Sequence, residues 1–225
     1  MKTFQLTLFE GHPIIHDGKN RILIDTGCLN TIHIANQFNF LDRNYNVTTN
    51  YGGTAIPGFC DLIGTPITTL LGADIIRDFI IVFDYRNGSV SFSTDPVNDF
   101  GGTIVNFTIA ISVPVLDLVI NNQEARCLLD TGAKFSYIKE SYTLNRKSDG
   151  IGADFFIGLG KYERPYFSME SNFREHILNV RYLTPPQPVL TALNSLRVDG
   201  IVGYDFMNNF RILLNLAGES LSYLK

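Results

Sequence analysis

Apolar and polar residues alternate along several stretches of the chain. Alternation with a period of two is typical of β-strands that bury one face. It runs from Thr3 to Phe9, returns over residues 89–92 and closes the chain over residues 219–223. Asp17-Gly18-Lys19-Asn20 has the composition of a hairpin turn between two such strands. The pattern predicts an all-β protein, with Thr3–Phe9 and Leu221–Leu224 as strands of one shared sheet.

Helical periodicity is limited to two short segments. Residues 74–79 and 205–210 each follow a Gly and are expected to form about a turn and a half of helix. Residues 94–102 contain Pro96 and a pair of Gly residues and are expected to be a linker. These features predict an N-terminal lobe at 1–94, a linker at 95–102 and a C-terminal lobe at 103–225. Neither lobe is large enough to close a good core alone, so the two are expected to pack together.

The chain contains an internal repeat with two landmarks. Leu23–Gly27 matches Leu128–Gly132 at an offset of 105 residues, and Leu71–Asp74 matches Val202–Asp205 at an offset of 131. The landmarks are 47 residues apart in the first copy and 73 in the second, so the second copy carries 26 more. We expect this insertion near residues 146–190. A unit written twice is expected to fold as two similar lobes related by a pseudo-two-fold axis.

Each copy delivers an Asp-Thr-Gly triplet from an apolar, strand-like run. One such triplet is typical of an ordinary turn after a strand, but two in matching contexts predict that Asp25 and Asp130 meet face to face. Two carboxylates about 3 Å apart share one proton, because both cannot ionise cheaply. The ionised member can then take a proton from water while the protonated member donates to a carbonyl oxygen. Thr26 and Thr131 offer hydroxyls that can bond across the two loops, or they merely suit strand ends.

This pattern resembles the aspartic peptidases of the pepsin and retroviral-protease superfamily. The resemblance rests on the triplet, then two apolar residues and a Gly, then a short helix and an apolar strand, all of it twice. Residues 70–84 resemble the closing segment of the pepsin family, and residues 201–210 resemble the retropepsin-like version. At this length the chain looks like a single-chain, tandem retropepsin. The resemblance implies two small β-barrel lobes with short helices, in the pepsin/retropepsin-like acid protease fold.

The resemblance also implies roles for particular residues. Asp25 and Asp130 would be the catalytic pair, and Thr26, Gly27, Thr131 and Gly132 would support the active-site loops. Enzymes of this kind close a Gly-rich hairpin, or flap, over the substrate. The expected flap and substrate-binding residues are Tyr51, Gly52, Gly53, Thr54, Ala55 and Ile56, with Pro57 and Gly58 following. A plain surface loop is the alternative. In the second copy residues 155–162 occupy the matching interval, and whether one flap or two are used stays open.

Composition narrows the class of protein. The chain has 225 residues, of which 45% are apolar and 18% charged, a balance that predicts a folded core. The net charge is −4 without a basic stripe, so no nucleic-acid partner is expected. The longest nearly apolar run, residues 109–120, is too short to span a membrane, and no membrane partner is expected. Residues 1–7 lack the apolar core of a signal peptide, and a cytoplasmic location is predicted.

Histidine and cysteine give no sign of a metal site. Cys28, Cys60 and Cys127 lack metal-ligand spacing, and so do the four histidines, so no metal and no cofactor are expected. Cys28 directly follows the first triplet, where it is either a small buried thiol or a redox brake on the carboxylates. The insertion contains Pro165, Pro185, Pro186 and Pro188, and it could shape substrate choice or bind a partner.

The leading functional prediction is a monomeric aspartic endopeptidase with an intramolecular pseudo-dimer, acting on peptides or proteins. The alternatives are a catalytically silent peptide-binding module and a module that processes one specific partner. The residues after the triplets are Cys28 and Ala133, where many acid-active pepsins have Ser or Thr. Neither is a strong hydrogen-bond donor to the ionised pair, so activity is expected to peak at mildly acidic pH, about 4.5–6.5.

Overall fold

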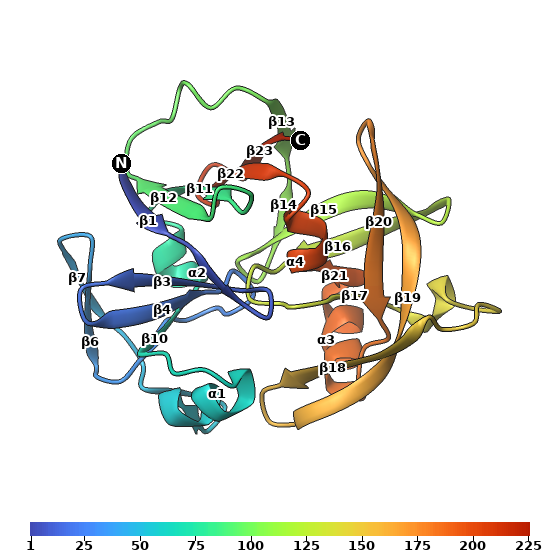
Figure 1. Ribbon diagram of the computed structural model, residues 1–225, viewed down its shortest axis with the longest axis horizontal. Helices are drawn as coiled ribbons and strands as arrows, with labels where there is room; N and C mark the ends of the chain where they lie inside the picture. The colour runs from blue at the N-terminus through green and yellow to red at the C-terminus, as the bar shows by residue number, and fades with distance from the viewer.

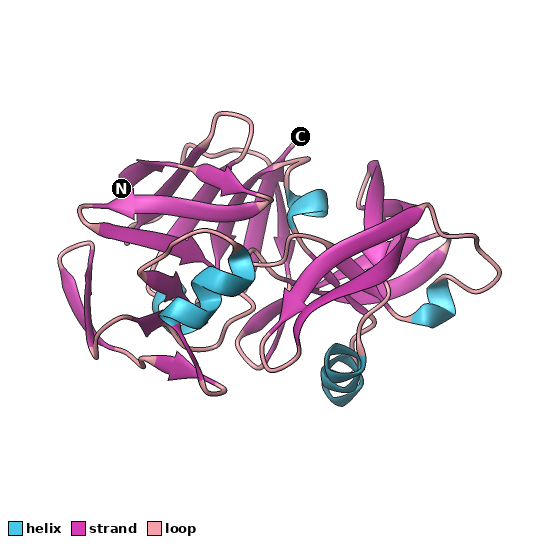
Figure 2. Ribbon diagram, turned by 60° about the horizontal axis from the view of Figure 1, so that its bottom comes forward, coloured by secondary structure: helices cyan, strands magenta, loops and turns pink.

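The computed structural model describes residues 1–225, and most of its regular structure is β-strand (Figure 1). A six-stranded sheet joins the two halves of the chain, and a further sheet lies on either side of it. Five helical segments, all short, interrupt the strands (Figure 2). None of these helices is long and apolar enough to cross a lipid bilayer.

The six-stranded sheet draws three strands from each half. In spatial order these are β1 (Lys2–Gln5), β12 (Ser89–Ser93), β11 (Ile80–Asp84), β22 (Arg211–Asn215), β23 (Ser220–Leu224) and β13 (Thr103–Asn106). The two central strands, β11 and β22, run antiparallel, and Val82 lies opposite Leu213 at the middle of their ladder. The last strand is confirmed where the alternating pattern predicts it.

The remaining strands form one sheet in each half and two small hairpins. The N-terminal sheet has the order β2 (Thr7–Phe9), β3 (His12–Asp17), β4 (Asn20–Ile24), β10 (Thr69–Leu71) and β5 (Ile32–His33). The C-terminal sheet has the order β14 (Thr108–Ala110), β15 (Val113–Ile120), β16 (Gln123–Leu129), β21 (Gly200–Val202), β17 (Ser136–Ile138), β20 (His176–Leu183), β19 (Gly160–Phe173) and β18 (Gly150–Phe156). The hairpins pair β6 (Gln37–Phe40) with β7 (Arg43–Asn46) and β8 (Asn50–Tyr51) with β9 (Thr54–Ala55).

Four of the five helical segments occupy matching places in the two halves. The five segments are α1 (Ile56–Ile63), α2 (Ala73–Ile76), the 3₁₀ turn η1 (Glu140–Tyr142), α3 (Gln187–Leu196) and α4 (Tyr204–Met207), and α1 matches α3 while α2 matches α4. The segments α2 and α4 overlap the two predicted short helices, but each begins one residue earlier and ends three residues earlier. The segments α1 and α3 are not predicted by the sequence pattern, because both carry Pro in the first turn. Pro is tolerated there, since the first helical N–H groups have no partner within the helix.

One predicted strand is wrong in its continuity. The run from Thr3 to Phe9 is divided into β1 and β2, which lie in different sheets. The break falls at Leu6, which is buried and whose N–H donates to the Gly88 carbonyl. Alternation does not reveal the break, because buried Phe4 and Leu6 alternate with exposed residues up to Thr7 without interruption. The second half repeats the break at Phe107, between β13 and β14.

Aromatic side chains fill much of the core. Phe40 packs edge-on against Phe79 and Phe92, with ring centroids 5.8 and 5.1 Å apart. In the second half Phe173, Phe210 and Tyr223 form a comparable cluster, with centroids 5.1–5.9 Å apart. Such pairs contribute about 0.5–1.5 kcal/mol each beyond their burial. The chain contains no Trp, so Phe and Tyr supply the large side chains of both clusters.

Candidate active site

Two loops bring Asp25 and Asp130 together between the halves of the molecule. Asp25 follows β4 and Asp130 follows β16, and each preceding strand lies parallel to a later one, β10 or β21. The Asp25 N–H donates to the Leu71 carbonyl at 2.9 Å, and the Asp130 N–H to the Val202 carbonyl at 3.0 Å. Both residues are partly buried, and each carboxyl group lies against the Gly of the opposite loop, so that the two groups face each other.

Backbone amides of the same loops bond to the two carboxyl groups. The N–H groups of Gly27 and Cys28 donate to Oδ1 of Asp25 at 2.9 and 3.0 Å. The Gly132 N–H donates to Oδ1 of Asp130 at 2.9 Å. A Cβ on either Gly would overlap the opposite carboxyl group, so only glycine allows this approach.

The two threonines lock the loops by a reciprocal exchange of hydrogen bonds. Thr26 N–H donates to Thr131 Oγ1 at 3.0 Å, and Thr131 N–H donates to Thr26 Oγ1 at 3.0 Å. Each hydroxyl donates in turn to a carbonyl of the opposite strand, Thr26 to Leu129 at 2.8 Å and Thr131 to Ile24 at 2.9 Å. All four bonds are buried, so breaking one would leave a polar group without a partner.

Behind each loop a second hydroxyl holds the Gly that follows the parallel strand. Thr31 Oγ1 accepts from the Gly72 N–H at 2.9 Å, and Ser136 Oγ accepts from the Gly203 N–H at 3.1 Å. A side chain on either Gly would collide with carbonyl groups of the loop. The apolar-apolar-Gly landmark of the repeat therefore supports the loops from behind.

Burial raises the pKa values of both carboxyl groups. The pKa of Asp25 is raised well above its ordinary range by burial and by the nearby charge of Asp130. Burial also raises the pKa of Asp130, although hydrogen bonds from Asp25 and from loop amides oppose the rise. One proton is therefore held between the two groups well above the pH at which a free carboxyl would lose it.

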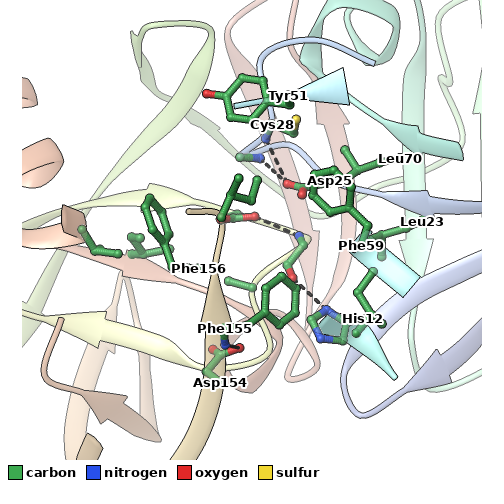
Figure 3. A pocket seen from close by; sticks show the side chains of 18 of the residues that line it. His12, Leu23, Asp25, Cys28, Tyr51, Phe59, Leu70, Asp154, Phe155 and Phe156 are labelled. Atoms are coloured by element: carbon green, nitrogen blue, oxygen red, sulfur yellow. Dashed lines mark hydrogen bonds between the residues drawn. The ribbon is translucent and has the colours of Figure 1, made fainter. Parts of the chain in front are cut away.

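The pair lies in a cleft of about 450 Å³. Figure 3 shows Asp25 at its centre, with Leu23, Phe59 and Leu70 on one side and Asp154 and Phe156 on others. Most of the residues that line the cleft are hydrophobic. A cleft with largely apolar walls and two facing carboxyl groups of raised pKa is suited to binding a peptide and to acid–base chemistry.

Only part of the predicted flap reaches the cleft. Tyr51 and Gly52 line it, whereas Gly53, Thr54 and Ala55 form the turn and returning strand of the β8–β9 hairpin. The backbone of Gly52 and Gly53 has φ values of 55° and 81°, as a two-residue hairpin turn requires. Ile56 is buried at the start of α1 and does not line the cleft. Helix α1 begins at Ile56, whereas the sequence predicted that the flap loop continues to Gly58.

A second hairpin, β18–β19, also reaches the cleft. Phe155, Phe156 and Ile157 near its tip line the cavity, in the interval that the sequence marked for a second flap. The two hairpin tips meet, because a side chain on Gly52 would lie 3.5 Å from the Ile157 side chain. The expected insertion over 146–190 contains β18, β19 and β20, so the extra residues of the second copy form long strands.

Three polar residues of the cleft were not predicted from the sequence: His12, Tyr137 and Asp154. Tyr162, which also lines it, is the last residue of the interval expected for a second flap. His12 Nδ1 donates to the Gly132 carbonyl at 2.9 Å, which ties the N-terminal hairpin to the second triplet. Its place in the repeat is taken by Val113, since β3 and β15 match at an offset of 101 residues. The sequence does contain a signal for His12: a polar residue stands in the first copy where the second copy has an apolar one.

Neither Cys28 nor any group of side chains supports redox or metal chemistry by its geometry. The Cys28 thiol is buried and donates to the Asn30 carbonyl at 3.2 Å. Burial raises its pKa, which keeps it in the less reactive thiol form. No group of three or more His, Cys, Asp or Glu side chains is placed to hold a metal ion.

Comparisons with known proteins give structural similarities alone. No protein-family model matches the chain, and a search of curated proteins gives no match. The solution structure of simian foamy virus (mac) protease matches with a TM-score of 0.30 and 11% identity, over 40% of this chain and 86% of that one. The EIAV protease in complex with the inhibitor HBY-793 matches with a TM-score of 0.33 and 22% identity, over 43% and 86%. At these values neither similarity carries an inference about function.

Proposed function

We propose that this chain is an aspartic endopeptidase that hydrolyses peptide bonds with water activated between Asp25 and Asp130. One observation carries the proposal: the two carboxyl groups, partly buried, face each other across the two glycine loops and line one cleft. Burying two acids side by side is costly for folding, and structural support alone would not require it. The arrangement fits a task that needs one acid and one base at the same point.

The mechanism follows from a single shared proton. The ionised carboxylate takes a proton from a water molecule, and that water oxygen attacks the peptide carbonyl carbon. The protonated partner donates its proton to the carbonyl oxygen, which gives a neutral tetrahedral diol. Collapse of the diol breaks the C–N bond, with one carboxyl group protonating the leaving amine and the other accepting the hydroxyl proton. The amides of Gly27, Cys28 and Gly132 hold the carboxyl groups in place throughout.

We also propose that the two halves are related by a pseudo-two-fold axis that passes between the carboxyl groups. The order of the six-stranded sheet supports this, because it reads the same from both edges once matching strands are exchanged. Val82 and Leu213, which pair at its centre, match each other at the offset of 131 residues. The reciprocal bonds of Thr26 and Thr131 follow the same exchange. One chain then supplies both halves of the site, and we propose that it acts as a monomer.

A peptide is the proposed substrate, held extended between the dyad and the hairpins β8–β9 and β18–β19. Both hairpins line the cleft and their tips meet, so a chain can enter only after they separate. We propose that both act as flaps. Closure would exclude water and bring the scissile carbonyl to the carboxyl groups.

Digestion of a peptide library, read by mass spectrometry, tests the proposal. The purified protein is compared with Asp25→Asn and Asp130→Asn, and with Asp61→Asn as a matched change on the exposed face of α1. We expect cleavage by the parent and by Asp61→Asn, and none above background by the two dyad variants. Cleavage retained in both dyad variants would place the chemistry elsewhere. A parent that binds peptides without cutting them would favour a peptide-binding module.

A further inference from the structure

Asp154 lies in the cleft beside the dyad, on the hairpin strand β18, and its carboxyl group is held by neighbours. Tyr137 donates a hydrogen bond from its hydroxyl to the Asp154 carboxyl group. The hydroxyls of Tyr137 and Tyr162 lie 2.7 Å apart, and the Phe155 N–H donates to Asp154 Oδ1 at 2.8 Å. These contacts fix the position of the carboxyl group, and none of them supplies a positive charge.

The Asp154 carboxyl group has no cationic partner within the chain. No Lys, Arg or His forms an ion pair with it. Two basic residues influence it, His12 and Lys134, and Lys134 is paired with Glu10 at 2.6 Å. His12 Nδ1 bonds to the Gly132 carbonyl, and burial lowers the pKa of His12, which disfavours its charged form. Desolvation raises the pKa of Asp154, which measures how costly its unpaired charge is.

The rest of the surroundings suit a cation. Tyr137, Tyr162, Phe155 and Phe156 line the cleft near Asp154 with aromatic rings, whose faces attract positive charge. Figure 3 shows Asp154 and Phe155 on one side of Asp25, and Leu70 and Phe59 on another. A lysine or arginine side chain can place its apolar stem against these rings and its charge at the carboxylate.

We propose that Asp154, Tyr137 and Tyr162 form a subsite for a lysine or arginine side chain of the peptide substrate. The inference rests on the proposed peptide-binding cleft and adds the chemistry of one bound residue. The subsite lies in the same cleft as the dyad, because Asp25, Asp130 and Asp154 all line that cleft. An extended chain advances about 3.3 Å per residue, so the basic residue is expected within about two positions of the cleaved bond.

The opposite side of the cleft takes a different residue. Leu23, Phe59, Ile63 and Leu70 line it without a charged group among them. Tyr137 is replaced by Ile32 at the matching position of the first copy, so that side lacks the hydroxyl that orients a carboxylate. The preferred substrate therefore carries a basic residue on one side of the cleaved bond and an apolar residue on the other.

The test uses peptides that differ only in charge. A library carries lysine, glutamine or norleucine in turn at each position, and cleavage by the parent protein is scored by mass spectrometry. Binding of the same library is measured with Asp25→Asn, which retains the cleft without the proposed chemistry. We expect a preference of about tenfold to a hundredfold for lysine over norleucine at one position, as for a buried charged hydrogen bond.

Two variants identify the source of the preference. Asp154→Asn keeps the shape of the side chain and is expected to reduce the lysine-to-norleucine ratio to near one. Glu163→Gln removes a charge from the exposed face of the same hairpin and should leave the ratio unchanged. Tyr137→Phe, which removes only the orienting hydroxyl, should give an intermediate ratio. The lysine-to-norleucine ratio of the parent protein is measured without any variant. It therefore tests the subsite even if Asp154→Asn fails to fold.

The outcomes separate this inference from the proposed function. Cleavage without a preference for lysine, or a preference that Asp154→Asn retains, would overturn the subsite and leave the peptidase standing. A lysine preference in binding without cleavage by the parent would uphold the subsite and overturn the peptidase. A parent that neither binds nor cleaves any peptide would overturn both.

Discussion

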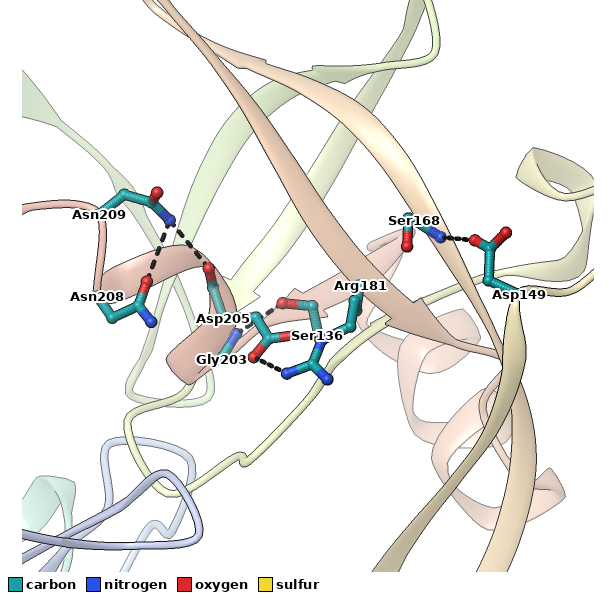
Figure 4. A network of polar contacts seen from close by, with 8 residues as sticks. All are labelled: Ser136, Asp149, Ser168, Arg181, Gly203, Asp205, Asn208 and Asn209. Atoms are coloured by element: carbon teal, nitrogen blue, oxygen red, sulfur yellow. Dashed lines mark hydrogen bonds and ion pairs between the residues drawn. The ribbon is translucent and has the colours of Figure 1, made fainter.

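The first and second copies of the repeat hold their active-site loops in different ways. In the first copy Asp74 accepts from the N–H and hydroxyl of Thr31, at 2.8 and 2.7 Å. In the second, Asp205 occupies the matching position but binds Arg181 of β20, through contacts of 2.8 and 3.0 Å (Figure 4). Ser136, the counterpart of Thr31, bonds directly to Gly203 alone. The second copy has thus exchanged a local loop contact for one with its long inserted strands.

The groups that touch the dyad differ much less between the copies. Both have the same triplet, the same Gly amide bonded to the carboxyl group and the same Thr exchange. The copies diverge in the walls of the cleft, where Val113 matches His12 and Tyr137 matches Ile32. If the chain is the proposed peptidase, a symmetric reaction centre is combined with an asymmetric binding surface, because substrate side chains would contact the walls and the scissile bond would contact the dyad.

The largest expected effect tests the equivalence of the two carboxyl groups. Asp25→Asn and Asp130→Asn should each reduce kcat/KM by at least about 10²–10⁴, because an amide can neither accept nor donate the shared proton as a carboxyl group does. The double variant should lose little more than either single one, since the two act as a unit. The measurement is steady-state cleavage of a quenched-fluorescent peptide. A large difference between the two single variants would break the proposed symmetry.

The threonine exchange should be equally important on both sides. Thr26→Val and Thr131→Val each leave a buried N–H and a buried carbonyl without a partner, and each should lower the free energy of unfolding by about 1–3 kcal/mol per lost partner. Thr26→Ser and Thr131→Ser keep the hydroxyl and serve as controls. Urea denaturation followed by circular dichroism gives the values. If the two valine variants lose unequal amounts of unfolding free energy, the two loops do not depend equally on the threonine exchange.

Outside the dyad the two copies should respond differently. Asp74→Ala removes the acceptor for two groups of Thr31 and is expected to cost about 1 kcal/mol or more. Arg181→Ala breaks a pair whose Arg side chain is 52% exposed and whose Asp205 side chain is 8% exposed. Solvent at the Arg side screens the pair, so the loss should be about 1 kcal/mol or less. Asp61→Ala, on the exposed face of α1, is the control for loss of a surface acid. A larger loss for Arg181→Ala would reverse the comparison.

The smallest expected effect concerns pH. In the proposed mechanism the active form has one proton on the dyad, and burial raises the pKa values of both Asp25 and Asp130. Activity should therefore appear only as pH rises above the ordinary carboxyl range near about 4, and it should persist until the pair loses its last proton. Peak activity at mildly acidic pH, about 4.5–6.5, is the expected rate–pH profile. An optimum near about pH 2 would contradict the raised pKa values.

Ala133→Ser sharpens the pH comparison. A hydroxyl that donates to the ionised dyad favours the charged form, so the acidic limb of the profile should move to lower pH by less than about one unit. The Cys28 thiol in the matching place donates to the Asn30 carbonyl and leaves the dyad alone. If the new hydroxyl behaves like that thiol, the profile of Ala133→Ser will coincide with that of the parent, and the residue after the triplet does not set the pKa of the dyad.

The sequence by itself determined the parts of the protein that a short motif encodes. The two triplets, the two apolar-apolar-Gly landmarks and the final strand lie where the repeat predicts them. Local chemistry is the reason, since a strand, a tight turn and a Gly that admits close approach need only neighbouring residues. The approach of Asp25 and Asp130 could be predicted because each copy of the repeat supplies one of them.

Only the tertiary structure decided the walls of the cleft. His12 and Asp154 come from distant parts of the chain, and no spacing between them reveals that they share a cavity. The helix α1 depends on burying Ile56, Phe59 and Ile63 against the N-terminal sheet, a gain that outweighs an unfavourable local sequence of Pro57 and Gly58. The break at Leu6 depends on a carbonyl from the Gly88 turn. In each case the local structure is stabilised by contacts with residues that are distant in the sequence. A pattern of neighbouring residues therefore cannot predict it.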